Sequence, residues 1–121
     1  MQFTLTPDRI RSMYDFLASC PPFDRWNLPA GEDVTFRRTR AKMVRGWYDK
    51  RKGKHVIALN PRFILTLELM MRTIAHEMIH LHEQETEMAT REQHTKAFMI
   101  LSRRVCKAFG WTEITDHTDM L

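Results

Sequence analysis

The segment from Thr73 to His82, TIAHEMIHLH, places three histidines and one glutamate within an otherwise apolar run. His76 and His80 are four residues apart, the spacing that brings two imidazoles to the same face of an α-helix. Two such imidazoles can bind one zinc ion, and the intervening Glu77 can reach a zinc-bound water as a general base. The motif therefore requires a helix here and predicts a zinc site on one side of it.

The residues around the motif predict a long helix from about residue 66 to about residue 84. At about 100° per residue, a broad apolar side lies opposite the histidines. It contains Leu67, Met70, Met71, Ile74, Met78 and Leu81. The other side carries Leu69, Thr73, His76, His80 and Glu83. His82 points away from the other two histidines, so we expect it to pack or to support a ligand rather than to bind metal.

A catalytic zinc site needs a third protein ligand and one open position. The preferred candidate is His94, because it heads an inward-facing stripe on a second predicted helix that ends near Phe109. Thr90 and Gln93 fit a capping box, which places His94 in the first turn of that helix. A glutamate ligand remains the alternative. Its candidates are Glu83, Glu85, Glu87 and Glu92.

The upstream sequence predicts one helix followed by strands. Thr6-Pro7-Asp8 is a typical helix start, and Pro21-Pro22 ends that helix near Cys20. Strands are expected over residues 34–37, 43–48 and 55–59, with a polar hairpin between the last two. These elements predict an α+β fold. It has an N-terminal helix, a three-stranded antiparallel or mixed sheet, and two packed helices that carry the HExxH motif and the third histidine.

Composition predicts one domain. The chain has 121 residues, 43% of them hydrophobic and 28% charged, which is typical of a small globular protein. We expect a single domain over residues 1–121, with its core at 34–111 and a polar tail at 112–121. The two cysteines are far apart and form no disulfide framework. Without a membrane-spanning run or a signal peptide, we expect a cytoplasmic protein with no membrane partner.

Positive charge is concentrated in one segment. The chain carries a net charge of +4, whereas residues 37–54 alone carry +8. A local excess of this kind can attract a polyanion, and DNA, single-stranded or duplex, is one candidate partner. The candidate contacts are Arg37, Arg38, Arg40, Lys50, Arg51, Lys52 and Lys54. The plainer alternative is a solvated strand pair with a basic turn. Trp47 could stack on bases, but core packing is the expected role.

Several of these segments together resemble the SprT-like zinc metallopeptidase domain, a family that includes the eukaryotic Spartan proteases. The resemblance covers about residues 34–111. It rests on Gly46-Trp47-Tyr48, on Ile57-Ala58-Leu59-Asn60-Pro61, on the segment from Thr73 to His80, and on His94 followed by Phe98. It implies a zincin-like fold and one catalytic Zn²⁺ bound by His76, His80 and His94, with Glu77 catalytic. Thr95 stands where the family often has glycine, and we expect the form without a C-terminal zinc ribbon.

The expected function is that of a zinc metalloendopeptidase acting on proteins or peptides, including proteins associated with DNA. The alternative is a non-catalytic DNA-binding module in which zinc only staples two helices. The strand over residues 55–59 is a candidate to pair with substrate, and Tyr48 is a candidate oxyanion donor. His55 and His117 are expected to be solvent-exposed. The sequence carries no signal for an oligomeric state.

Overall fold

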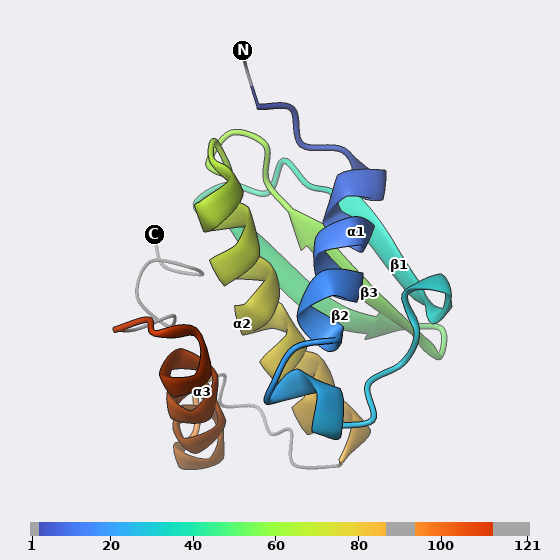
Figure 1. Cartoon of the computed structure of the whole chain (residues 1–121). Coiled ribbons are helices and arrows are strands. Elements are labelled where there is room, and N and C mark those ends of the chain that lie inside the picture. Colours follow the sequence, from blue (N-terminus) through green and yellow to red (C-terminus); the bar gives the residue numbers. More distant parts are fainter. Residues whose placement is uncertain (1–2, 87–93, 113–121) are drawn as a thin grey trace.

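The computed structural model describes residues 3–86 and 94–112 (Figure 1). Its main elements are α1 (Pro7–Ala18), β1 (Val34–Arg38), β2 (Gly46–Arg51), β3 (Lys54–Leu59), α2 (Leu67–Glu85) and α3 (Lys96–Phe109). Two short 3-10 helices, η1 (Phe23–Arg25) and η2 (Gly31–Asp33), connect α1 to β1. The predicted α+β fold, with an N-terminal helix, three strands and two later helices, is confirmed.

The first helix begins as its sequence predicts. The hydroxyl of Thr6 accepts a hydrogen bond from the Arg9 N–H at 3.2 Å, and proline occupies the first helical turn. The buried face of α1 carries Ile10, Tyr14 and Leu17. These side chains anchor α1 against the sheet and α2.

The sheet is mixed, with strand order β1-β3-β2. β1 runs parallel to β3, and β2 runs antiparallel to it from Gly46 opposite Leu59 to Arg51 opposite Lys54. β2 lies about three residues later than the strand predicted over residues 43–48, and the turn between β2 and β3 is shorter than the predicted hairpin loop. The expectation that residues 55–59 pair with substrate is wrong, because β3 is the central strand and already has a partner on both sides.

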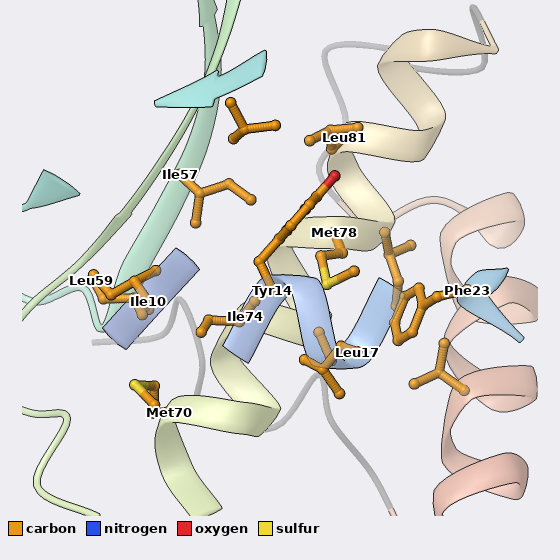
Figure 2. Close-up of a cluster of buried hydrophobic side chains, with 14 of the residues drawn as sticks. Ile10, Tyr14, Leu17, Phe23, Ile57, Leu59, Met70, Ile74, Met78 and Leu81 are labelled. Atoms are coloured by element: carbon orange, nitrogen blue, oxygen red, sulfur yellow. The ribbon is translucent and has the colours of Figure 1, made fainter. Parts of the chain in front are cut away.

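The helices form layers over the sheet. α1 and α2 lie side by side on one face, and α3 packs against α2 (Figure 1). Side chains from α1, β3 and α2 meet in the core between these elements (Figure 2). Fully buried members include Tyr14, Ile57, Leu59, Ile74 and Met78. No helix in the described part of the chain is long and apolar enough to cross a membrane.

Gly46 brings β2 into close contact with α2. A Cβ atom at this position would lie 2.8 Å from the Ala58 carbonyl oxygen and 3.1 Å from Cγ2 of Thr73. Thr73 is fully buried and lies one helical turn before His76. The edge strand β2 is thus packed directly against the helix that carries the HExxH motif.

Trp47 lies on the sheet face away from the helices, since successive strand residues point to opposite faces and Gly46 faces α2. It is half-buried and lies outside the main hydrophobic core. Its indole N–H donates to the Thr39 hydroxyl at 3.2 Å, and the Arg51 guanidinium lies 4.5 Å from its ring centroid. The expectation that Trp47 packs in the core is therefore wrong.

Candidate metal centre

α2 holds the HExxH motif in its buried middle. The Thr66 hydroxyl caps the helix by accepting the Leu69 N–H at 3.1 Å, so the predicted helix over about 66–84 is observed over Leu67–Glu85. Because α2 lies between the sheet and α3, His76 is 0% exposed and Glu77 is 2% exposed. His80, one turn further on, is half-buried.

The segment that carries the third histidine starts its helix later than predicted. α3 begins at Lys96, and its N-cap is Thr95, whose hydroxyl accepts the Phe98 N–H at 3.2 Å. The capping box expected at residues 90–93 lies outside the described residues. His94 therefore precedes the helix and is exposed, rather than lying in the first turn of an inward stripe. The Thr95 hydroxyl provides the helix start directly before the apolar run.

The three predicted ligands converge through the same ring atom. Nε2 of His76 lies 3.2 Å from Nε2 of His80 and 3.2 Å from Nε2 of His94. One donor atom from each ring lies within 4.8 Å of the other two. Tetrahedral zinc with Zn–N bonds of 2.0–2.1 Å separates its ligand nitrogens by about 3.3 Å. These distances fit a single zinc ion shared by the three rings.

The chemistry of the donor atoms supports the same interpretation. An imidazole nitrogen carries either one proton or one lone pair. A single Nε2 that faces two others at 3.2 Å is better matched to a shared cation than to two good hydrogen bonds. The set therefore fits a metal that prefers imidazole ligands, as zinc does.

Phe98 packs against all three histidines. Its ring centroid lies 5.0 Å from that of His76, 4.6 Å from that of His80 and 4.7 Å from that of His94. Phe98 is 0% exposed and comes from the first turn of α3. One buried aromatic ring thus limits the orientation of every imidazole in the cluster.

Glu77 lies between the histidine side of α2 and the side that meets the sheet. It is about 100° around the helix from His76 and one turn beyond Thr73, which contacts Gly46 of β2. It is 2% exposed, so its side chain is buried where these two sides of the helix meet.

Two of the four rival glutamate ligands are placed by the structure, and neither joins the cluster. Oε1 of Glu83 lies 3.5 Å from Nδ1 of His80, the ring nitrogen on the far side from the converging Nε2 atoms. Oε1 of Glu85 lies 2.9 Å from Nε2 of His55. Glu87 and Glu92 lie outside the described residues. Among the described residues, the three histidines form the candidate metal-binding group.

Glu83 was considered in the sequence only as a rival metal ligand, whereas the structure places it behind His80, in contact with Nδ1. It is 3% exposed, and its other oxygen, Oε2, lies 3.5 Å from the Thr95 hydroxyl. Burial raises the pKa of Glu83, while the bond from Thr95 and the nearby His76 lower it. Its position three residues after His80 was visible in the sequence, but its contact with Thr95 depends on how α2 and α3 pack.

The remaining histidines lie elsewhere. His82 stacks on Trp26 with ring centroids 4.4 Å apart, and burial lowers its pKa, which agrees with a packing role. The expected exposure of His55 is wrong, since it is 7% exposed. Its Nδ1 lies 2.6 Å from the Tyr48 hydroxyl, and its Nε2 contacts Glu85. His117 lies outside the described residues.

The predicted DNA-contacting residues fall into two groups at opposite ends of the sheet. Arg37, Arg38 and Arg40 line one hollow with Pro7, Phe36 and Pro61 near the end of β1. Lys50, Arg51, Lys52 and Lys54 lie at the β2–β3 hairpin, where Lys54 pairs with Arg51. Strand alternation places Arg37 and Arg51 on the same sheet face as Trp47.

A third set of exposed cations was not predicted. It lies on α3, which carries no acidic residue, and consists of Lys96, Arg103, Arg104 and Lys107. All four positions lie within the helix predicted to end near Phe109, so their place on one helix was visible in the sequence.

Comparison with known families agrees with the resemblance found in the sequence. A family model described as the SprT-like family matches residues 23–118. The match covers all three strands, α2 and α3, and therefore Glu77 and the three converging histidines. It starts before the expected boundary at residue 34. No curated protein matches the chain.

Proposed function

Because this chain belongs to the SprT-like family, we propose that it is a zinc-dependent metallopeptidase that hydrolyses peptide bonds. The observation that carries the proposal is the convergence of three Nε2 atoms beside Glu77, with 3.2 Å from His76 to each of the other two. Three histidine ligands from the described residues would leave one position of a four-coordinate zinc ion open to water or substrate. A purely structural zinc site is usually closed by four protein ligands.

In this proposal His76, His80 and His94 hold the metal. Zinc at this position would supply Lewis acidity, polarising the scissile carbonyl and making an attacking water more acidic. The Glu77 carboxylate takes the proton from that water and delivers it to the nitrogen of the leaving amine. Phe98 keeps the three rings oriented, which reduces the rearrangement that metal binding requires.

The edge strand β2 is the proposed guide for the substrate. Among the described strands it pairs with β3 alone, so its other edge can accept an extended peptide by strand addition. Gly46 holds this edge against α2 at Thr73, one turn from His76. A peptide added there would run past Glu77, with its backbone hydrogen-bonded and its alternate side chains facing the enzyme.

Glu77→Gln tests the proposal against a non-catalytic zinc-stapled module. We expect the variant to fold and to keep one equivalent of zinc, because Glu77 is not a ligand in this scheme. Cleavage of a denatured protein substrate should fall by the about 10²–10⁴-fold typical of a lost general base. Equal cleavage by the variant and the wild type would refute the assigned role of Glu77. Zinc binding without any cleavage by the wild type would support the stapled module.

Association with DNA is a second proposal, supported by a different observation. Trp47 and Arg37 both lie beside Ala58 on the face of the sheet away from the helices. Arg51 stacks on Trp47 with 4.5 Å between its guanidinium carbon and the ring centroid. An aromatic ring flanked by cations suits the bases and phosphates of a single strand. Cleavage of proteins bound to DNA would follow if this face and the metal centre act together.

If DNA binds this face, the affinity should fall steeply as the salt concentration rises, and it should depend on residues of this face. Arg37→Gln/Arg51→Gln and Trp47→Ala should weaken binding of a labelled single strand, measured by fluorescence anisotropy at several salt concentrations. Arg103→Gln/Arg104→Gln on α3 removes the same charge elsewhere and is the matched control. If both double variants weaken binding equally, attraction is general and the assigned face is wrong.

A further inference from the structure

Glu83 is a buried carboxylate next to the metal centre that no step of the proposed reaction uses. It lies in α2, three residues after His80, and is 3% exposed. Burying a carboxylate is costly unless nearby groups hydrogen-bond to it or carry opposite charge. The two oxygens of this side chain therefore point to the groups that make its burial acceptable.

Those two oxygens reach both segments that carry ligands. Oε1 lies 3.5 Å from Nδ1 of His80, within α2. Oε2 lies 3.5 Å from the hydroxyl of Thr95, the residue that directly follows His94. One side chain thus bridges α2 to the start of α3, although the two segments are separated by the residues between Thr86 and His94.

The Thr95 hydroxyl is suited to both of its contacts. As the N-cap of α3 it accepts the Phe98 N–H at 3.2 Å, which uses an oxygen lone pair. The hydroxyl proton remains to be donated, and the Glu83 carboxylate can accept it. The same residue therefore fixes the beginning of α3 and ties it to α2, which sets the position from which His94 approaches.

We propose that Glu83 is a positioning residue that raises zinc affinity by orienting His80 directly and His94 through Thr95. The inference rests on the proposed zinc site. When Nε2 of an imidazole binds a metal, its Nδ1–H is left to donate, and a carboxylate acceptor fixes the tautomer and increases ligand basicity. Glu83 contacts the nitrogen of His80 that faces away from the cluster, so it acts behind the ligand and not as a ligand.

The test measures zinc affinity by competition with a chromophoric chelator, using the full chain. Glu83→Gln removes the charge at constant size, and Glu83→Leu keeps a buried side chain of similar volume should Gln prevent folding. Both should bind zinc about 10–100-fold more weakly, the usual cost of losing such a partner. Glu85→Gln removes a carboxylate from the same helix that contacts His55 instead, and its zinc affinity should stay at the wild-type value.

Thr95 variants test the bridge itself. Thr95→Ser keeps the hydroxyl and should bind zinc as the wild type does. Thr95→Val loses it and should bind more weakly, with a smaller further loss when combined with Glu83→Leu, because the two side chains act through one contact. Unfolding of each variant in excess chelator separates a loss of metal affinity from a loss of fold.

The outcomes are distinct. Wild-type zinc affinity in Glu83→Gln and Glu83→Leu would overturn the positioning role while leaving the proposed peptidase intact. An equal loss in Glu85→Gln would also overturn it, since the effect would then be general electrostatics. A wild-type protein that binds no zinc would overturn the proposed function and this inference together. Weaker zinc binding in the Glu83 variants alone would support it.

Discussion

The two halves of the candidate metal centre are held by very different amounts of structure. His76 lies in the middle of α2, fully buried between the sheet and α3. His94 is exposed and stands before the N-cap of α3. It meets the other half through ring contacts and through the bridge from Thr95 to Glu83.

This difference suggests how the site is assembled. The α2 half is fixed by the same packing that stabilises the whole domain, so we expect it to be formed without zinc. The His94 half depends on one helix cap and one aromatic ring, so fewer contacts stabilise its position. Zinc binding should therefore order the second half more than the first.

Removing one ligand from each half gives the largest expected effects. His76→Ala and His94→Ala should each weaken zinc binding by more than the about 10–100-fold expected for an outer-shell partner. The zinc-free forms of the two variants should differ in stability, because His76 is buried whereas His94 is exposed. Urea unfolding in excess chelator should show a lower midpoint for His76→Ala and a change within about 0.5 kcal/mol for His94→Ala. Equal destabilisation would show that both halves are equally part of the core.

Phe98→Ala should damage both halves at once. The ring is fully buried and touches all three histidines, so its loss leaves a cavity that costs about 3–5 kcal/mol of unfolding free energy. Zinc affinity should also fall, because the imidazoles lose their common support. Ile100→Ala is the control, since Ile100 lies on the exposed face of α3 at 43% exposure. Similar unfolding midpoints for the two variants would contradict the central place given to Phe98.

Much of the fold was predictable because its signals are local. A cap at Thr6 and an apolar periodicity located α1 and α2 to within about two residues. The order of the strands was not predictable, because it depends on which edges meet in space rather than on any one segment. The wrong assignment of residues 55–59 as a substrate-binding edge has this origin.

In the site, too, the features with a local sequence signal were predictable and those that depend on other elements were not. The spacing of His76 and His80 is a local helical signal, and both residues lie in α2 as predicted. The roles of His55 and Glu83 could not be predicted, because their partners lie on other elements and hydrogen bonds of this kind leave no periodic trace. The start of α3 was misplaced because two threonines could each serve as a cap, and Thr95 is the one observed.

Gly46→Ala should weaken the packing of β2 against α2, the helix that carries His76. An added methyl group would press on the Ala58 carbonyl and on the Thr73 side chain, at 2.8 Å and 3.1 Å. Overpacking of this kind costs about 1–3 kcal/mol, and here it would push β2 away from α2. Urea unfolding measures the loss, and peptide cleavage should fall more than zinc affinity because the edge strand moves while the ligands stay. An unchanged midpoint would mean that β2 can shift without cost.

Tyr48→Phe should give the smallest change and tests the tie at the end of α2. It removes the hydroxyl that contacts Nδ1 of His55 at 2.6 Å, and Nε2 of His55 in turn contacts Glu85. The substitution should lower the free energy of unfolding by about 1 kcal/mol near neutral pH.

Burial, with Glu85 and Asp49, raises the pKa of Tyr48 well above its ordinary value. The unfolded chain therefore ionises first, and this contribution to stability is present below about pH 10 and is lost as pH rises above it. Tyr48→Phe cannot ionise, so unfolding midpoints in chelator between about pH 8 and pH 11 should decline less steeply than in the wild type. Tyr14, whose pKa burial also raises, should retain part of the decline. Identical slopes for the two proteins would remove Tyr48 from the alkaline transition, and an unchanged midpoint at neutral pH would mean that the chain through His55 does not stabilise this end of α2.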